Sequence, residues 1–451
     1  MEQMTVKDIV KATGGRLLCG DENKSLAHIC IDSNQVRNGD LFVPLIGERV
    51  DAHRFLPAAI EAGAGAVLTS KDTEKDSPCP WIWVEDTKKA LQAIGSYYRS
   101  RLTLPLIGIT GSVGKTTTRE MVAAALSAGF RVYKTPGNKN SQVGVPITLS
   151  EITKEDEIGV LELGMSLPGE MTVIAKIAQI DLAVIINVGV AHMELLGSQE
   201  KIYQEKLNIQ DGLKPEGILL LNGDDPLLKT TKGREGRRTF YYGVGENCDY
   251  RATDIQLVDG YPVFTAVHGE KKVLVKLKVM GNHQVGNALA ALAVADLYGV
   301  PMEKAAEKLG EFTGFKGRQQ VFERSGVTVI DDTYNASPAS MEAALNVLVS
   351  MKKTGQKIAV LADMRELGQE EVRYHKEIGI WLSKHPVDAI LTLGELSREI
   401  EAEGTYCRHF AEGDQEGLFK EISGFVKAGD CILFKGSRSM NLDQVVKKLW
   451  Q

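Results

Sequence analysis

The sequence has few cysteines, and none of them stand close together. Six cysteines are spread over 451 residues, and no Cys-x-x-Cys motif occurs among them. A zinc site or a disulfide framework needs cysteines at short or regular spacings, so the sequence favours neither. We expect reduced thiols, as is typical of a protein of the cytosol.

Long apolar runs and an excess of positive charge are also missing. No apolar stretch approaches the roughly 20 residues of a membrane-spanning helix, and residues 1–8 lack the apolar core of a signal peptide. The formal net charge is −6, whereas a general nucleic-acid binder needs a basic surface that displaces counterions from phosphates. We expect a soluble intracellular protein, with no nucleic-acid partner and no insertion into a membrane.

What remains is the composition of an ordinary globular protein, with 25% charged and 43% hydrophobic residues. The length suits about three domains. Short apolar segments separated by polar residues predict a small α/β domain over residues 1–85. Alternating strand and helix patterns predict a mostly parallel sheet with helices on both faces over residues 86–314. Further buried-strand runs separated by helical stretches predict a third α/β domain over residues 315–451.

The central part contains the pattern of a phosphate-binding loop. An apolar strand at residues 106–110 meets a glycine-rich turn, and residues 116–128 have the spacing of an amphipathic helix. Gly111 and Gly114 allow a tight turn whose N–H groups converge on an anion, and the helix N-terminus adds partial positive charge. The further glycine of the strict motif is replaced by Ile109, so this loop is a shortened variant. The pattern predicts a nucleoside triphosphate site.

Residues with the chemistry of such a site stand in and after the loop. Lys115 would reach the terminal phosphates, and the Thr116 hydroxyl would bind Mg²⁺. Glu162 interrupts an apolar strand at residues 158–164, where a carboxylate is costly unless it is paired or bound to metal. It is a candidate Mg²⁺ ligand, with a structural glutamate as the alternative. His192 follows another buried strand at the edge where α/β sheets place ligands, although a structural histidine is the commoner case.

The remaining polar stretches are less specific. Residues 281–287 offer amides and an imidazole at the start of an alanine-rich helix, which suits a nucleotide base. Residues 315–320 bring two cations together at a domain joint, as phosphate binding or a solvated linker would. Residues 328–338 form a strand that ends in two adjacent carboxylates. In the N-terminal part, residues 32–34 and 51–53 are polar groups at strand ends, where turn residues are the simpler explanation. By pattern alone, Lys206 is a surface lysine.

Taken together, these motifs resemble the Mur ligases of peptidoglycan synthesis, nearly from end to end. The shortened loop is typical of that superfamily. The Asp-Asp-x-Tyr-Asn and Asp-Met-x-Glu-Leu-Gly motifs single out the member that adds a dipeptide. The stretches that carry the resemblance are Asp32-Ser33, Gly39-Asp40-Leu41-Phe42, Thr110 to Thr116, Thr135 to Asn140, Glu162-Leu163-Gly164, Asn187 with His192, Gly317-Arg318, Asp331 to Asn335, Asp363 to Gly368, and Lys435 to Arg438.

The resemblance implies a fold and an activity. It implies an N-terminal domain that holds a UDP-sugar, a central ATP-binding P-loop domain and a C-terminal Rossmann-like domain that closes on ATP and binds the incoming dipeptide. ATP would phosphorylate the terminal carboxylate of UDP-N-acetylmuramoyl-tripeptide, and the amine of D-alanyl-D-alanine would attack the acyl phosphate. The implied cofactors are ATP and two Mg²⁺ ions. The implied state is a monomer in the bacterial cytoplasm.

The resemblance also assigns roles to residues of this chain. Lys206 matches a lysine that is carbamylated in several family members. The implied catalytic residues are Lys115, His192, Lys206 and Arg318. The implied metal ligands are Thr116, Glu162, His192 and Lys206. The implied nucleotide-binding residues are Gly111, Ser112, Val113, Gly114, Lys115, Thr116, Thr117, Asn282, His283, Asn287, Arg318 and Asp331. The implied substrate contacts are Ser33, Phe42, His53, Asn138, Asn140, Tyr334, Asn335, Ser437 and Arg438.

Three other classes of protein share part of this pattern. A folylpolyglutamate synthase would have the loop and the ligase chemistry, but it would lack the N-terminal domain and the Asp-Asp-x-Tyr-Asn motif. A diamino-acid-adding Mur ligase would carry a different segment at residues 331–338. A nucleotide switch or a P-loop kinase needs only the loop, which leaves Glu162, His192 and Arg318 unexplained. The sequence leaves open whether the third peptide residue is lysine or diaminopimelate.

Overall fold

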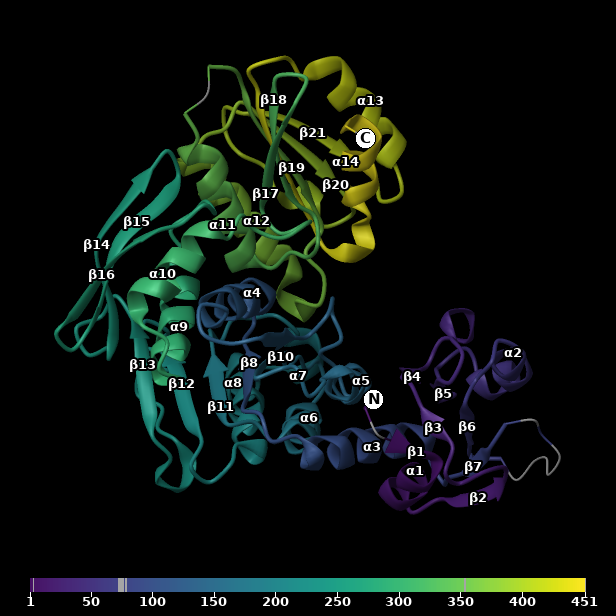
Figure 1. Cartoon of the computed structure of the whole chain (residues 1–451). Coiled ribbons are helices and arrows are strands. Elements are labelled where there is room, and N and C mark those ends of the chain that lie inside the picture. The colour runs from purple at the N-terminus through teal and green to yellow at the C-terminus, as the bar shows by residue number, and fades with distance from the viewer. Residues whose placement is uncertain (3, 72–76, 78, 353, 451) are drawn as a thin grey trace.

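The computed structural model describes residues 1–2, 4–71, 77, 79–352 and 354–450. The strands of these residues form four sheets. Figure 1 shows three α/β domains: a small N-terminal domain at one side, a central domain, and a C-terminal domain above α4 (Lys115–Leu126) of the central domain in that view. The structure therefore confirms the predicted α/β class with a central, mostly parallel sheet flanked by two further domains.

The N-terminal domain is built on a five-stranded sheet with the order β2-β7-β6-β5-β4. Its long helix, α3 (Thr87–Arg101), packs against α1 (Val6–Thr13) within this domain and against α5 (Gly144–Glu151) and α6 (Glu170–Ala178) of the central domain, so it joins the two. A separate antiparallel pair is formed by β1 (Met4–Thr5) and β3 (Ser25–Leu26). The remaining elements are α1 (Val6–Thr13), β2 (Arg16–Cys19), β4 (Ile29–Cys30), η1 (Ser33–Gln35), β5 (Leu41–Phe42), η2 (Ala52–Phe55), α2 (Leu56–Glu61), β6 (Ala66–Thr69), β7 (Trp81–Trp83) and α3 (Thr87–Arg101).

The central sheet has nine strands in the order β16-β15-β14-β13-β12-β11-β8-β10-β9. Helices cover both faces, with α4, α9 and α10 packed over one hydrophobic cluster and α5, α6 and α8 over the other. Its strands are β8 (Leu106–Thr110), β9 (Val132–Lys134), β10 (Ile158–Glu162), β11 (Leu182–Ile185), β12 (Ile218–Asn222), β13 (Thr239–Gly243), β14 (Tyr250–Val258), β15 (Tyr261–His268) and β16 (Lys271–Lys276). Its helices are α4 (Lys115–Leu126), α5 (Gly144–Glu151), α6 (Glu170–Ala178), α7 (Met193–Leu196), α8 (Gln199–Leu207), η3 (Asn208–Gly212), η4 (Arg234–Gly236), α9 (Gln284–Leu297) and α10 (Met302–Glu311).

The far edge of this sheet departs from the predicted alternation of strands and helices. β14, β15 and β16 pair antiparallel as a meander. The turn between β14 and β15 is Asp259-Gly260, and both residues have positive φ, 51° and 85°. A two-residue turn with φ above zero at both positions matches the twist of a hairpin, which explains why no crossover helix is needed here.

Register within the central sheet places the predicted site loops side by side. β8 pairs in parallel with β10 through Ile109 and Glu162, and with β11 through Thr110 and Ile185. Because parallel strands end at the same edge, the loops that follow β8, β10 and β11 meet there. The observed α4 begins one residue before the predicted helix and ends at Leu126.

The C-terminal domain has a six-stranded sheet with the order β17-β18-β22-β19-β20-β21, in which only the edge strand β17 runs antiparallel to its neighbour among the strands described. Val190, Tyr261 and Met280 of the central domain pack against its hydrophobic core. Its elements are β17 (Gln320–Arg324), β18 (Val327–Asp332), α11 (Pro338–Ser350), β19 (Lys357–Ala362), η5 (Gly368–Glu370), α12 (Glu371–Lys384), β20 (Ala389–Leu393), η6 (Ser397–Glu399), β21 (Tyr406–Phe410), α13 (Gln415–Phe425), β22 (Cys431–Lys435), η7 (Arg438–Met440) and α14 (Leu442–Trp450).

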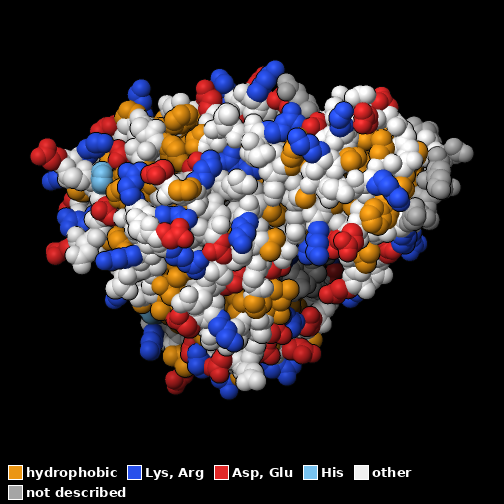
Figure 2. Space-filling view, turned by 90° about the horizontal axis from the view of Figure 1, so that it is seen from below, with side chains coloured by type: hydrophobic (Ala, Val, Ile, Leu, Met, Phe, Trp, Pro, Cys, Tyr) orange, Lys and Arg blue, Asp and Glu red, His pale blue; other side chains and the backbone are white. Residues whose placement is uncertain are grey.

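The surface mixes charges of both signs. Figure 2 shows lysine and arginine side chains interspersed with aspartate and glutamate over the face seen from below, with small groups of apolar side chains between them. Among the described residues, none of the helices combines the length and the hydrophobicity that crossing a bilayer requires.

Candidate active site

The phosphate-binding loop lies between the end of β8 and the start of α4. Gly114 has a φ of 88°, in the left-handed region that suits glycine, and it directly precedes Lys115 at the helix N-terminus. The loop is braced by Asn187, whose Oδ1 accepts hydrogen bonds from the N–H groups of Ser112 and Val113 at 3.0 and 2.9 Å. In this structure these two amides, which were predicted to bind phosphate, are therefore bonded within the protein. The sequence motif contained Asn187 but gave no sign of this role.

Two lysines from different elements share the space beside the loop. Lys115 donates to the carbonyl of Gly111 at 2.7 Å. Burial lowers the pKa of Lys115, Glu162 opposes that shift, and the charge of Arg318 adds to it. Burial also lowers the pKa of Lys206 well below its ordinary value, and the charge of Lys115 lowers it further. The structure thus brings together three cations that are far apart in the sequence, as a site for phosphate groups requires.

Glu162 is buried and its carboxylate is held from three sides. The Thr116 hydroxyl donates to Oε2 at 3.0 Å, and Arg119 lies 3.2 Å from the same oxygen. The amide of Asn140 donates to Oε1 at 2.8 Å. Asn140, predicted to contact substrate, therefore orients the carboxylate in this structure. Thr116 and Glu162 are adjacent, as a shared Mg²⁺ would require.

Arg119 is a site residue that the sequence analysis missed. Its side chain is almost fully buried and also lies 2.6 Å from Glu120 and 3.0 Å from the carbonyl of Gly137. It links α4 to the loop that carries Asn138 and Asn140. The sequence could have pointed to Arg119 by its spacing, because it stands three residues after Thr116 and both side chains then lie on one face of the helix.

We expect Arg119→Met to lower the free energy of unfolding by about 3–5 kcal/mol, because it removes the cation that is paired with both buried carboxylates, Glu120 and Glu162. Urea denaturation followed by circular dichroism measures the change. Arg131→Met is the matched control, since Arg131 is 66% exposed in its pair with Glu157, and we expect a loss below about 1 kcal/mol. Equal losses in the two variants would contradict the structural role of Arg119.

Lys206 lies inside the protein, contrary to its surface-like pattern. Its side chain is 2% exposed on α8, where Ile202 and Leu207 are also buried. Among the described residues, no hydrogen bond or ion pair holds its amine. The adjacent Glu205 is engaged by the N–H groups of Gly169 and Met171. Burial of an amine favours its neutral form, which can react with an electrophile, although the nearby charge of Glu205 opposes this shift.

A residue of the C-terminal domain, Glu366, contacts His192 of the central domain. His192 precedes α7 with a φ of 66°, and its Nδ1 lies 2.6 Å from Oε2 of Glu366. The contact with His192 lowers the pKa of the Glu366 carboxyl. His192, predicted to bind metal, follows β11 at the sheet edge that also carries the loop after β8, and it contacts Glu366, which was not predicted as a site residue.

The residues predicted to bind the base divide into two groups. Asn282 and His283 are exposed at the start of α9, and His283 lies 3.1 Å from Gln319 of the C-terminal domain. Asn287 is buried, and its amide accepts from Thr118 at 3.0 Å and donates to Gln284 at 2.9 Å. Asn287 therefore ties α9 to α4 beside Gly114. Thr117 lies half-buried in the first turn of α4.

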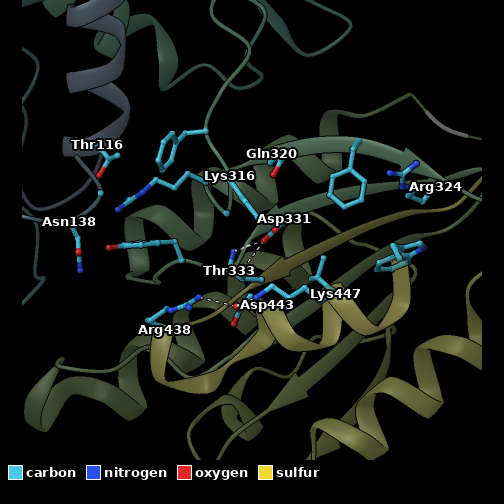
Figure 3. Close-up of a pocket in the computed structure, with 18 residues that line it drawn as sticks. Thr116, Asn138, Lys316, Gln320, Arg324, Asp331, Thr333, Arg438, Asp443 and Lys447 are labelled. Carbon is cyan, nitrogen blue, oxygen red and sulfur yellow. Dashed lines mark hydrogen bonds and ion pairs between the residues drawn. The ribbon is translucent and has the colours of Figure 1, made fainter. Parts of the chain in front are cut away.

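A cavity of about 690 Å³ lies between the central and C-terminal domains. Figure 3 shows Thr116 and Asn138 on the central side, facing Asp331, Thr333 and Arg438 of the C-terminal domain. Arg438 is ion-paired with Asp443 at 3.2 Å, and Asp331 accepts from Thr333. The cavity is large enough for a small-molecule ligand.

Arg318 faces this cavity with its guanidinium stacked 3.9 Å from the ring centre of Tyr334. Its Nε is buried and has no hydrogen-bond partner among the described residues. A planar guanidinium held on an aromatic ring keeps its remaining N–H groups in one direction. Arg318 and Tyr334 therefore both line the cavity.

Four of the predicted substrate contacts have other partners. Phe42 is fully buried in the N-terminal core, and both ring nitrogens of His53 are engaged, by Asp51 and by Ser70. Ser437 is buried and accepts from the N–H of Arg365, and the Asn335 amide is bonded to the N–H of Ala336. In this structure Phe42 and His53 therefore serve the packing and hydrogen bonding of the N-terminal domain. Ser33 is half-buried in η1.

The side chains beside the phosphate-binding loop suit a magnesium–nucleotide complex better than a metal site made of protein ligands alone. Among the described residues, no group of three histidine, cysteine or acidic side chains could hold a metal ion by itself. Mg²⁺ is usually held by one or two carboxylates together with substrate phosphates. Thr116 and Glu162 supply one hydroxyl and one carboxylate next to the N-terminus of α4, so these residues fit a Mg²⁺ ion that is bound together with a nucleotide.

Comparison with protein-family models matches three segments of the chain. Residues 25–99 match the Mur ligase family catalytic domain, residues 109–295 the Mur ligase middle domain, and residues 317–438 the Mur ligase glutamate ligase domain. These matches cover parts of all three domains of the fold.

Individual relatives are similar over the full length. The chain is 38% identical to the UDP-N-acetylmuramoyl-tripeptide–D-alanyl-D-alanine ligase of Bacillus subtilis, and the match covers 100% of this chain and 99% of the relative. It is 32% identical to the ligase of the same name from Escherichia coli, again with 100% of this chain and 99% of the relative covered. The crystal structure of MurF from Acinetobacter baumannii aligns with a TM-score of 0.91 at 31% identity, covering 99% and 98% of the two chains. MurF from Thermotoga maritima in complex with ADP aligns with a TM-score of 0.84 at 31% identity, covering 94% and 96%.

Proposed function

The chain belongs to the Mur ligase family, and we propose that it joins D-alanyl-D-alanine to UDP-N-acetylmuramoyl-tripeptide at the expense of ATP. The main support for this proposal is that the chain is 38% and 32% identical in sequence, over its whole length, to two ligases of that activity. The ADP complex of a MurF structure supports use of ATP. The site agrees, because its cations and its carboxylate meet where a phosphate-binding loop faces the C-terminal domain. Neither a nucleotide switch nor a P-loop kinase would need that arrangement.

The reaction consists of two displacements. In the first, the terminal carboxylate of the tripeptide forms a bond to the γ-phosphorus of ATP as the bond to the β-phosphate oxygen breaks and ADP leaves. In the second, the amine of the dipeptide attacks the acyl carbon, phosphate leaves with the bonding electrons, and the amine loses a proton. Both steps concentrate negative charge. Lys115 at the start of α4 and Arg318 at the cavity, whose charges act on each other, would stabilise it.

Thr116 and Glu162 would hold one Mg²⁺, and His192 with Lys206 would hold a second. Bound Mg²⁺ supplies charge neutralisation on the phosphates. For Lys206 to take part, its amine must react with CO₂, forming a carbamate and releasing one proton. The burial of the amine supports this proposal, because burial lowers its pKa well below the ordinary value despite the opposing charge of Glu205, and a carbamate would turn the nitrogen into an anionic ligand.

The three domains would divide the substrates among themselves. We assign residues 1–85 to the UDP-sugar, residues 86–314 to ATP, and residues 315–451 to domain closure and the dipeptide. Asn138, Tyr334 and Arg438 remain the candidate contacts for tripeptide or dipeptide at the cavity. Closure would keep water away from the acyl phosphate. We further propose that the protein acts as a monomer in the bacterial cytoplasm.

Phosphate release tests the activity. The protein is incubated with ATP, Mg²⁺ and UDP-N-acetylmuramoyl-tripeptide, with and without D-alanyl-D-alanine, and the nucleotide product is weighed by mass spectrometry. We expect phosphate release that depends on the dipeptide, with a UDP-linked pentapeptide as product. Turnover with a dipeptide-linked acceptor and a single diamino acid would instead identify the diamino-acid-adding reaction. Lysine and diaminopimelate tripeptides are compared in the same assay.

A further inference from the structure

One loop of the C-terminal domain, residues 363–368, lies directly on α7 of the central domain. The N–H of Glu194 donates to the carbonyl of Glu366 at 3.3 Å, and Oε2 of Glu366 lies 2.6 Å from Nδ1 of His192. A methyl group added at Gly368 would sit 3.2 Å from Cα of Glu194. The two segments therefore approach at backbone distance, and the side-chain contact is part of a wider docking surface.

Both residues of the side-chain contact have a strained backbone. His192 has a φ of 66° and Glu366 a φ of 67°, and neither is glycine. Side chains beyond Cα disfavour this region, so such residues persist where the surrounding structure fixes them and where they serve a site. The strain on both sides of one interdomain contact indicates that the contact has a role beyond covering surface.

The geometry at His192 suits a ligand that is oriented by a carboxylate. A histidine that binds a metal through one ring nitrogen usually has its other nitrogen against a carboxylate or a carbonyl, which fixes the ring and its tautomer. Nδ1 of His192 is buried and lies 2.6 Å from Oε2 of Glu366, an ion-pair contact whose angles are not those of a hydrogen bond in this structure, so Nε2 is the nitrogen left for a ligand. Unusually, the carboxylate comes from a different domain.

We propose that Glu366 is a positioning residue that fixes the His192 ring, so that the magnesium–nucleotide site is complete only when the C-terminal domain is docked. The inference rests on the proposed function. Docking would then do two things at once, bringing Arg318 to the cavity and setting His192 in place. Glu366 touches neither substrate nor metal in this proposal and acts through His192 alone.

Binding of Mg²⁺ with a non-hydrolysable ATP analogue tests the proposal without turnover. Calorimetric titration compares the unaltered protein with Glu366→Ala and Glu366→Gln. We expect about 10- to 100-fold weaker binding for Glu366→Ala. Glu366→Gln should bind more tightly than Glu366→Ala, because the amide oxygen keeps a polar acceptor beside Nδ1 of His192. Glu370→Ala is the matched control, since Glu370 is paired with Arg373 at the start of the next helix. Unaltered binding in Glu366→Ala would overturn the proposal.

A double variant separates positioning from a general structural effect. In a His192→Ala background, the further change Glu366→Ala should weaken binding less than about twofold, because the residue through which it acts is gone. An undiminished further loss would overturn the proposal. Thermal midpoints should stay close to that of the unaltered protein, since the Glu366 side chain is 53% exposed. Failure of the unaltered protein to bind the nucleotide would overturn the proposed function instead, and this inference with it.

Discussion

Lys115→Ala will lower ATP-dependent ligation by about 10²- to 10³-fold or more, while UDP-N-acetylmuramoyl-tripeptide still binds. Lys115 begins α4, and its ammonium already lies against the loop carbonyl of Gly111. Removing one preorganised charge from the place where negative charge develops is among the largest single losses that an active site can suffer. Initial rates of phosphate release measure the loss, and calorimetric titration with the UDP-tripeptide measures the binding that remains.

Lys304→Ala is the matched control, because Lys304 is exposed on α10 of the same domain. Its rate should stay close to that of the unaltered protein. Loss of both ligation and UDP-tripeptide binding in Lys115→Ala would contradict the assignment of the UDP-sugar to the N-terminal domain. A rate within a few-fold of the original would remove Lys115 from the reaction.

Lys206→Ala will also abolish most ligation, and the unaltered protein will need CO₂ for full activity. The reason is the buried amine, whose pKa lies well below the ordinary 10.5, chiefly because of desolvation. A neutral amine is nucleophilic at a pH where a surface lysine is protonated. Protein prepared in buffer freed of CO₂ should regain activity when bicarbonate is added. With ¹³C-bicarbonate, a carbamate signal should appear in the NMR spectrum of the unaltered protein and be absent from Lys206→Ala.

Two further variants sharpen this test. Lys201→Ala changes an exposed lysine on the same helix and should retain both the activity and the carbamate signal. Lys206→Glu supplies a carboxylate on a shorter side chain and should be more active than Lys206→Ala. If bicarbonate has no effect on the unaltered protein and the signal is missing, Lys206 acts as a plain cation or a packing residue.

Local sequence patterns were sufficient for the phosphate-binding loop. The order of strand, glycine turn and helix at residues 106–126 is set by neighbours in the chain, and it appears in the structure with a shift of one or two residues. Glu162 could also be predicted, because a carboxylate inside an apolar strand needs a partner wherever that strand lies. Its partner Thr116 was in the predicted set as well, and the structure places the two 3.0 Å apart.

Other site residues were beyond prediction from local patterns. Asn187 occupies two loop amides that were expected to bind phosphate, and Phe42 and His53 lie in or against the N-terminal core. The pattern of α8 gave no warning that Lys206 is buried. That burial depends on which helix face the rest of the central domain covers, and the covering residues come from other parts of the chain.

The sequence by itself determined the three-domain α/β plan, the nucleotide loop and, through its resemblance to a family, the class of reaction. Those features depend on periodicity, on glycine conformations and on motifs that lie within a few residues of each other. Only the tertiary structure decided the burial of Lys206, the bracing of Glu162 by Arg119 and the contact of Glu366 with His192. Each of these joins segments distant in the chain, and the energy of such a contact is set by the packing of whole elements rather than by local preference.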